Sequence, residues 1–147
     1  MLSLLLVTAQ ACASQELVVR HLNPSALPAP NGYSHVVEVQ GGRTLFLSGQ
    51  IAIDKAGAVV GQGDLRAQTQ QVFENLKAAL GAAGATLDQV VKITVFMTDV
   101  SGLQVFREVR DGYFTKNPPA SSLVQVSRLV RPELLIEIEA VAVIEGG

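Results

Sequence analysis

Two glutamates, Glu137 and Glu139, stand two positions apart in the apolar run of residues 134–144. Side chains alternate between the two faces of an extended strand, so both carboxylates share one face with apolar neighbours. A carboxylate buried among apolar side chains is costly unless it is paired, hydrogen-bonded or neutralised. We therefore take both glutamates as functional candidates, of the kind whose protonation proteins tune for chemistry, with exposed rim carboxylates as the alternative.

Other polar residues could offer hydrogen bonds to a ligand. Ser48 and Gly49 end an expected strand, where a hydroxyl and a backbone N–H could bind an anion, or where the glycine could simply mark a bulge. Tyr33 follows a glycine and is either a ligand contact or a tyrosine at the edge of the core. Arg107 and Arg110 lie on an expected helix, and we interpret both as solvated.

The sequence lacks the patterns of common metal, disulfide and nucleotide sites. A single cysteine, Cys12, excludes an intrachain disulfide, and with His21 and His35 it has no metal-ligand spacing. The glycines of residues 61–63 precede a helix, but Arg66 occupies the place of the third glycine of a dinucleotide-binding loop. We therefore expect neither a metal ion nor a cofactor.

Length and composition indicate a single folded domain. The chain has 147 residues and a mass of 15.5 kDa. Its 48% hydrophobic and 16% charged residues exclude intrinsic disorder, and so few charges suggest surface hidden in an oligomer, a membrane or an export segment. A net charge of −2 and a pI of 5.6 argue against nucleic acid as a partner. No apolar run reaches the roughly 18 residues of a membrane span.

Hydrophobic periodicity and turn residues predict an α+β order of elements. Strands are expected over residues 33–40, 44–53, 90–97, 123–126 and 134–144. The glycine pair between the first two strands predicts a β-hairpin. Asp64 is expected to cap a helix that ends near Gly84, and Ser101 to begin a second helix.

The last expected strand, residues 134–144, has two largely apolar faces. The helices can cover only one of them. The simplest cover for the other face is a second copy of the same chain. We therefore expect an oligomer in which Glu137 and Glu139 lie between subunits.

Residues 1–15 differ from the rest of the chain. They carry no charged side chain, begin with an apolar stretch and continue with small residues that fit an A-x-A cleavage site. The segment is a possible signal peptide, or else an ordered N-terminal strand of the domain that residues 16–147 form. The two interpretations are nearly balanced. We favour an exported or periplasmic protein, with a cytoplasmic protein as the alternative.

Four stretches together resemble the RidA family, also called YjgF, of reactive-intermediate imine deaminases. They are residues 47–51 (LSGQI), 68–77 (QTQQVFENLK), 91–99 (VKITVFMTD) and 136–143 (IEIEAVAV). The resemblance implies a chorismate-mutase-like fold, one sheet with two helices on one face, in a homotrimer whose sheets form a central barrel. Ligands of this family bind in clefts between the subunits.

The resemblance also implies a reaction and its residues. The family hydrolyses 2-imino acids, or their enamine tautomers, to 2-keto acids and ammonia. A glutamate of the last strand holds the water in the family, and Glu137 matches it as the catalytic residue. The candidate substrate-binding residues are Tyr33, Ser48, Gly49, Arg107, Ser121, Ser122 and Leu123. The expected ligand is a small carboxylic, imino or keto acid.

The chain departs from the family where the substrate carboxylate is anchored. The family uses an arginine in a P-A-R-S-x-V stretch, whereas residues 119–124 are PASSLV, with Ser121 in place of the arginine. A neutral hydroxyl cannot supply a charged fork, and its loss should cost about 10- to 1,000-fold in carboxylate affinity. Arg107 is a candidate to restore the charge, and a solvated Arg107 is the alternative.

Two functions remain open at this stage. We favour hydrolytic deamination of 2-imino acids, which the family resemblance supports. The alternative is a non-deaminating, small-molecule-binding member with a different ligand, which Ser121 supports. Endoribonuclease activity, a label that the family sometimes carries, is disfavoured by the acidic pI and the lack of a basic patch.

Overall fold

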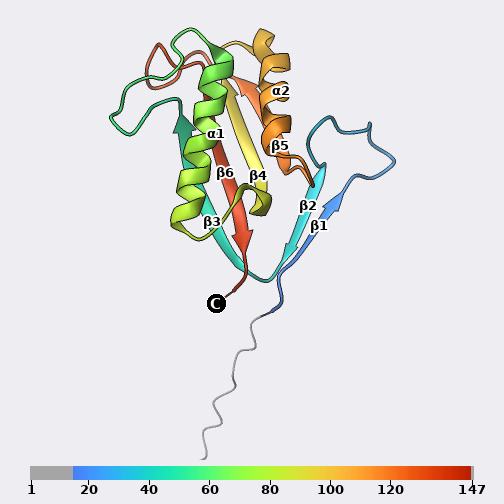
Figure 1. Cartoon of the computed structure of the whole chain (residues 1–147). Coiled ribbons are helices and arrows are strands. Elements are labelled where there is room, and N and C mark those ends of the chain that lie inside the picture. Colours follow the sequence, from blue (N-terminus) through green and yellow to red (C-terminus); the bar gives the residue numbers. More distant parts are fainter. Residues whose placement is uncertain (1–14, 147) are drawn as a thin grey trace, which may run out of the picture.

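Strand β6 (Ile136–Ile144) occupies the interior of a four-stranded sheet in the computed structural model, which describes residues 15–146. It pairs antiparallel with β3 (Arg43–Ile51) on one side and with β4 (Val90–Met97) on the other. Strand β5 (Ala120–Gln125) pairs parallel with β4, giving the order β3-β6-β4-β5 (Figure 1). The last strand of the described chain is therefore held between two earlier ones.

Two helices, α1 (Leu65–Ala82) and α2 (Leu103–Tyr113), lie on one face of this sheet (Figure 1). Asp64 caps α1 as predicted, because its side chain accepts the N–H of Ala67 at 3.1 Å. Short 3₁₀ turns, η1 (Leu87–Gln89) and η2 (Val100–Gly102), precede β4 and α2. The predicted α+β class with two helices on one face is confirmed.

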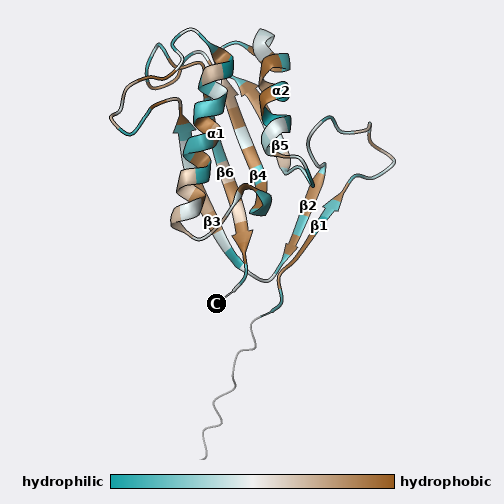
Figure 2. Ribbon diagram, viewed as in Figure 1, coloured by the Kyte–Doolittle hydropathy of each residue, from teal (hydrophilic) through white to brown (hydrophobic). Residues whose placement is uncertain are grey.

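The core fills the space between the sheet and the helices. Alternate residues of β6 are buried there, together with apolar side chains of α1 and α2 such as Phe73 and Phe106. In Figure 2 the strands of this sheet are mostly hydrophobic, and the helices alternate between hydrophobic and hydrophilic residues. The other face of the sheet, which we call the open face, carries Lys92, Thr94 and Glu139; the segment with Leu17 and Val19 lies beside it at the buried Val143, and the part around Glu139 is exposed.

The predicted hairpin between residues 33–40 and 44–53 is wrong. Strand β2 (Val36–Gln40) pairs instead with β1 (Val18–Leu22), a strand that sequence reasoning did not identify, and the two form a separate sheet (Figure 1). The ion pair between Arg20 and Glu38, 2.9 Å apart, joins directly opposed residues of β1 and β2. Cross-strand charge pairs of this kind favour one partner strand over another.

The interpretation of residues 1–15 as a signal peptide or a strand lies, except for Gln15, outside the described residues. Within the described part of the chain, neither helix combines the length and apolar character needed to cross a bilayer.

Candidate functional site

A β-bulge in β3 places Ser48 and Gly49 beside β6. Leu47 pairs with Ala140 and Gln50 with Ile138, so three steps along β3 match two along β6. The extra residue falls at Ser48 and Gly49, and bulges of this kind re-aim side chains and backbone groups. The glycine thus marks a bulge, as one sequence interpretation held, and the bulge adjoins a functional candidate.

That candidate is Glu137, whose carboxylate lies against Gly49. A Cβ atom on Gly49 would lie 2.8 Å from Cδ and 3.0 Å from Cγ of Glu137, and closer still to Oε1. Only glycine leaves room for the carboxylate here. The half-buried Glu137 accepts no hydrogen bond from any side chain among residues 15–146, so its oxygens are free to bind water or a ligand.

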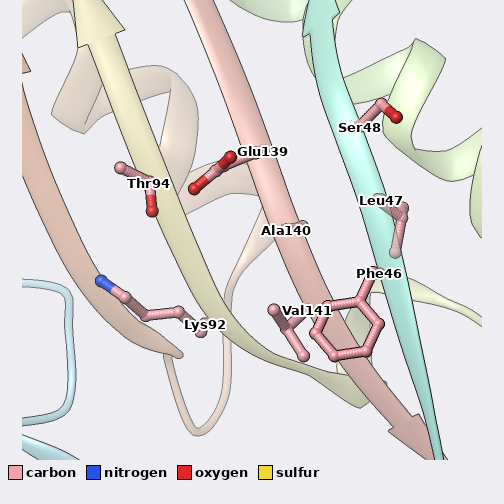
Figure 3. A pocket seen from close by; sticks show the side chains of 8 residues that line it. All are labelled: Phe46, Leu47, Ser48, Lys92, Thr94, Glu139, Ala140 and Val141. Atoms are coloured by element: carbon pink, nitrogen blue, oxygen red, sulfur yellow. The ribbon is translucent and has the colours of Figure 1, made fainter.

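A shallow pocket of about 240 Å³ lies on the open face, and its carboxylate is that of Glu139, with neither Glu137 nor Gly49 in the lining. Figure 3 shows the Glu139 carboxylate beside Thr94, the Lys92 side chain extending toward the neighbouring strand, and the Phe46 ring next to Val141. The pocket is amphipathic, with an ammonium and a carboxylate over an apolar floor. The residues that line it are Phe46, Leu47, Ser48, Lys92, Thr94, Glu139, Ala140 and Val141.

Lys92 is a site residue that sequence reasoning missed. Its Nζ donates a hydrogen bond to Ser122 Oγ at 2.7 Å. Partial burial lowers the pKa of the Lys92 ammonium, and the negative charge of Glu139 acts in the opposite direction. A lysine inside the otherwise β-branched run of residues 90–97 was the sequence signal that could have revealed it.

The three predicted binding residues of β5 point to different sides of the sheet. Ser121 and Leu123 are paired with Ile93 and Val95, whose side chains are buried under the helices. Ser122 instead meets Lys92 on the open face. Because neighbouring side chains alternate, Ser121 and Ser122 cannot present their hydroxyls to one ligand on one face.

Tyr33 is held next to the start of β5. Its neighbour Ser34 donates its N–H to Pro119 O at 3.0 Å and its hydroxyl to Pro118 O at 2.6 Å. The Tyr33 ring meets His35 edge to face, with 5.2 Å between centroids. Tyr33 and Ser121 therefore belong to one group of predicted residues, at the β5 edge.

The predicted site residues thus form two groups within one chain. Ser48, Gly49 and Glu137 lie on β3 and β6, whereas Tyr33 and Ser121 lie at β5. Strand β4 separates β6 from β5. Adjacent strands are about 4.8 Å apart, so β6 and β5 are about 10 Å apart, and the two groups are also displaced along the strands because Glu137 is level with Val124 and not with Ser121.

The two arginines of α2 differ in burial. Arg107 is half-buried and hydrogen-bonds to no other group in the described part of the chain. Arg110, which we predicted to be solvated, is only 4% exposed, and that prediction is wrong. It lies one helical turn beyond Phe106, with its guanidinium 5.6 Å from the Phe106 ring centroid, and so shares the buried stripe of α2.

Among residues 15–146, no group of three or more His, Cys, Asp or Glu side chains is arranged to hold a metal ion.

Comparisons with known proteins agree with this architecture. A family model described as Endoribonuclease L-PSP matches residues 23–144. The RutC family protein PH0854 of Pyrococcus horikoshii is 46% identical over 117 residues, covering 78% of this chain and 90% of its own length. The 2-iminobutanoate/2-iminopropanoate deaminase of Dermatophagoides farinae is 35% identical over 127 residues, covering 86% of this chain and 97% of its own.

Solved structures give the same result. The crystal structure of YyfB from Yersinia pestis, described as a protein of unknown function of the conserved Rid protein family, superposes with a TM-score of 0.81. It is 41% identical in sequence, and the match covers 86% of this chain and 98% of that structure.

Proposed function

The chain belongs to the endoribonuclease L-PSP family, also called YjgF/RidA, and from this membership we propose that it hydrolyses small 2-imino acids to 2-keto acids and ammonia. Membership confirms the resemblance noted in the sequence and the chorismate-mutase-like fold that it implied. The specific reaction is supported by one relative, the mite protein named as a 2-iminobutanoate/2-iminopropanoate deaminase.

The proposed reaction asks little of a protein. Water adds to the carbon of the C=N bond, the nitrogen takes up protons, and the C–N bond breaks to leave a keto group and ammonia. The protein must hold the substrate carboxylate, position one water and move a proton. No cofactor takes part in this scheme.

Glu137 carries the proposal. Its carboxylate lies against the bulge at Gly49 and has no hydrogen-bond donor among the side chains of residues 15–146. In our scheme it accepts a proton of the attacking water and delivers it to the leaving nitrogen. Ser48 and the backbone at Gly49 bind the substrate beside it.

A coupled assay tests this proposal. A dehydratase generates 2-iminobutanoate in the presence of the protein, and release of 2-oxobutanoate and ammonia is compared with release by spontaneous hydrolysis. Wild type should accelerate release, and Glu137→Gln should reduce the rate by about 10²-fold, the usual scale of a proton-transfer group. Glu145→Gln, at an exposed glutamate just after β6, is the matched control and should keep the rate. Equal rates with and without wild type would reject the deaminase.

We also propose that the active unit is a homotrimer. Phe46 is 83% exposed and Val124 is 46% exposed on the open face. Apolar side chains of this size gain by being covered, and a second copy of the chain supplies a cover. Packing of copies edge to edge would also place the Glu137 group of one copy near the Tyr33 and Ser121 group of another.

A second function is favoured by one observation. Ser121 offers a single neutral hydroxyl at the position of the family's arginine. A member that binds a different small molecule without deaminating it would need no such charge. Imine hydrolysis equal to the spontaneous rate, together with saturable binding of an uncharged ligand, would favour this alternative.

A further inference from the structure

Arg110 is the buried charge that the proposed mechanism does not yet use. Its Nε and Nη2 donate hydrogen bonds to Asp111 Oδ1 at 2.9 and 2.7 Å, and Nη2 also donates to Asn31 O at 3.1 Å. Asp111 is 55% exposed, so the ion pair joins a buried cation to a carboxylate at the surface. A buried guanidinium requires such partners.

One end of the guanidinium remains without a partner. Arginine has five N–H donors, and the bonds to Asp111 and Asn31 use only Nε and Nη2. Nη1 has no hydrogen-bond acceptor among residues 15–146, and it is not fully enclosed there. It is therefore the unpartnered donor of a side chain that is 4% exposed.

The backbone at Gly32 is shaped around this guanidinium. Gly32 has φ of +71°, a conformation that favours glycine, and a Cβ there would collide with Arg110 Nη2 and lie 2.8 Å from Asp111 Oδ1. Tyr33 follows directly, and Ser34 is hydrogen-bonded to the start of β5. Residues 31–34 thus connect Arg110 to the strand that carries Ser121.

Ser121 turns toward the same layer. Its partner on β4, Ile93, is buried on the helix side of the sheet, so the Ser121 side chain leaves β5 on the side where α2 lies. A long cationic side chain at position 121 would have projected into that layer. Here the layer contains a cation from α2 instead.

We propose that Arg110 is the ligand-binding cation of this chain and that its Nη1 receives the carboxylate of a small 2-imino or 2-keto acid. This inference rests on the proposed function and names the anchor that Ser121 no longer provides. Asp111 holds the guanidinium in place through Nε and Nη2, and its negative charge opposes that of a ligand carboxylate at Nη1. Arg107, half-buried and without a hydrogen-bond partner in residues 15–146, has no comparable setting.

The test measures selectivity for charge. Binding of 2-oxobutanoate and of its uncharged amide, 2-oxobutanamide, to the full chain is measured by isothermal titration calorimetry. Wild type should prefer the acid by about 10-fold, the difference between a charge-assisted and a neutral hydrogen bond. Arg110→Gln should abolish the preference, and Arg107→Gln, the matched control on the same helix, should keep it. If Arg110 had only a structural role, Arg110→Gln would lower the affinities for both ligands equally and leave their ratio unchanged.

Two further variants keep the inference testable if Arg110→Gln folds poorly. Asp111→Asn keeps a side-chain oxygen that can accept from Arg110 and removes the neighbouring negative charge, so acid affinity should rise while amide affinity stays the same. Adding Ser121→Arg to Arg110→Gln should restore the preference for the acid. If wild type hydrolyses imines, two results would overturn the Arg110 assignment and leave the proposed function in place. One is an unchanged ratio of acid to amide affinity in Arg110→Gln, and the other is an unchanged acid affinity in Asp111→Asn. Failure of wild type to hydrolyse imines and to bind either compound rejects the proposed function and the anchor with it.

Discussion

The carboxylate of Glu137 fills the space that a side chain on Gly49 would occupy, with Glu137 Cδ only 2.8 Å from the Cβ position. Gly49→Ala should therefore turn the carboxylate away from the bulge. We expect imine hydrolysis to fall by about 10²-fold, because a misplacement of about 1 Å in a catalytic group is enough for such a loss. Because the end of a glutamate side chain can rotate, the free energy of unfolding should fall by only about 1 kcal/mol. The coupled assay and urea unfolding measure the two effects.

A double-mutant cycle checks the cause of the Gly49→Ala effect. In a Glu137→Ala background the collision is gone, and Gly49 does not have a positive φ. Alanine should then stabilise the protein by about 0.4–1 kcal/mol through the unfolded state. The same destabilisation in both backgrounds would mean that Gly49 is required for another reason.

The open face offers a prediction about assembly. Val141 lies opposite Phe46 in the β3–β6 pair and lines the pocket of that face. Val141→Asp should dissociate the proposed trimer, because it would bury an unpaired charge between copies. Light scattering at micromolar concentration measures the change in mass. Val130→Asp, at a 77% exposed valine outside the sheet, is the control and should leave the mass unchanged. A wild type that is monomeric under these conditions would contradict the proposal.

Tyr113 offers a spectroscopic prediction. Burial, and next the hydrogen bond to Glu74, raise the pKa of Tyr113 to about 12. The chain has two tyrosines and no tryptophan, so near-ultraviolet absorbance follows tyrosine ionisation directly. Tyr113→Phe should remove the ionisation near pH 12. Glu74→Gln should lower the pKa of Tyr113 without returning it to 10.0, because burial remains.

The same shift predicts how stability depends on pH. The folded-state pKa of Tyr113 is raised, so the unfolded chain ionises first as pH increases. The contribution of Tyr113 is therefore complete below about pH 10 and is lost toward pH 12. Urea unfolding of Tyr113→Phe should lack this decline, and a wild-type decline that persists in the variant would count against the assignment.

Lys92 should affect stability with the opposite dependence on pH. Burial lowers its pKa below 10.5, so the folded state gives up the proton before the unfolded state does. Wild type should gain stability from this group as pH rises from the lowered pKa to 10.5. Any stability advantage of Lys92→Met should therefore shrink across that interval. Urea unfolding at several pH values measures it, and a difference between Lys92→Met and wild type that stays constant across the interval would contradict the prediction.

Local patterns predicted the parts of the fold that local physics decides. The alternation along β6 identified its buried face, from Leu134 to Ile144, because side chains of a strand must alternate. Asp64 was identified as a cap because a cap depends on one side chain and the next few N–H groups. Both outcomes follow from residues close together in the sequence.

The errors came from contacts between distant segments. Strand β2 pairs with β1 and not with β3, and Arg20 of β1 forms an ion pair with Glu38 of β2. The position of Arg110 one helical turn beyond Phe106 puts it on the buried stripe of α2, but its hydrogen-bond partner Asn31 is 79 residues away in the chain. The hydrogen bond between Lys92 and Ser122 likewise spans 30 residues. Only the family resemblance suggested that Ser48 and Glu137 belong to one site.

The interior position of β6 has a consequence for synthesis on the ribosome. Arg43 of β3 cannot pair until its partner Ile144 has been synthesised, and β4 cannot pair with β6 before then either. A nascent chain that ends before β6 can form α1 and α2 but cannot join β3 to β4, and it contains no Glu137. Pairings between such distant segments are slow, because loop closure precedes any gain from contacts. The apolar faces of the helices therefore lack the part of their cover that β6 supplies until the strand with the proposed catalytic carboxylate has emerged, so completion of the sheet and arrival of that carboxylate are one event.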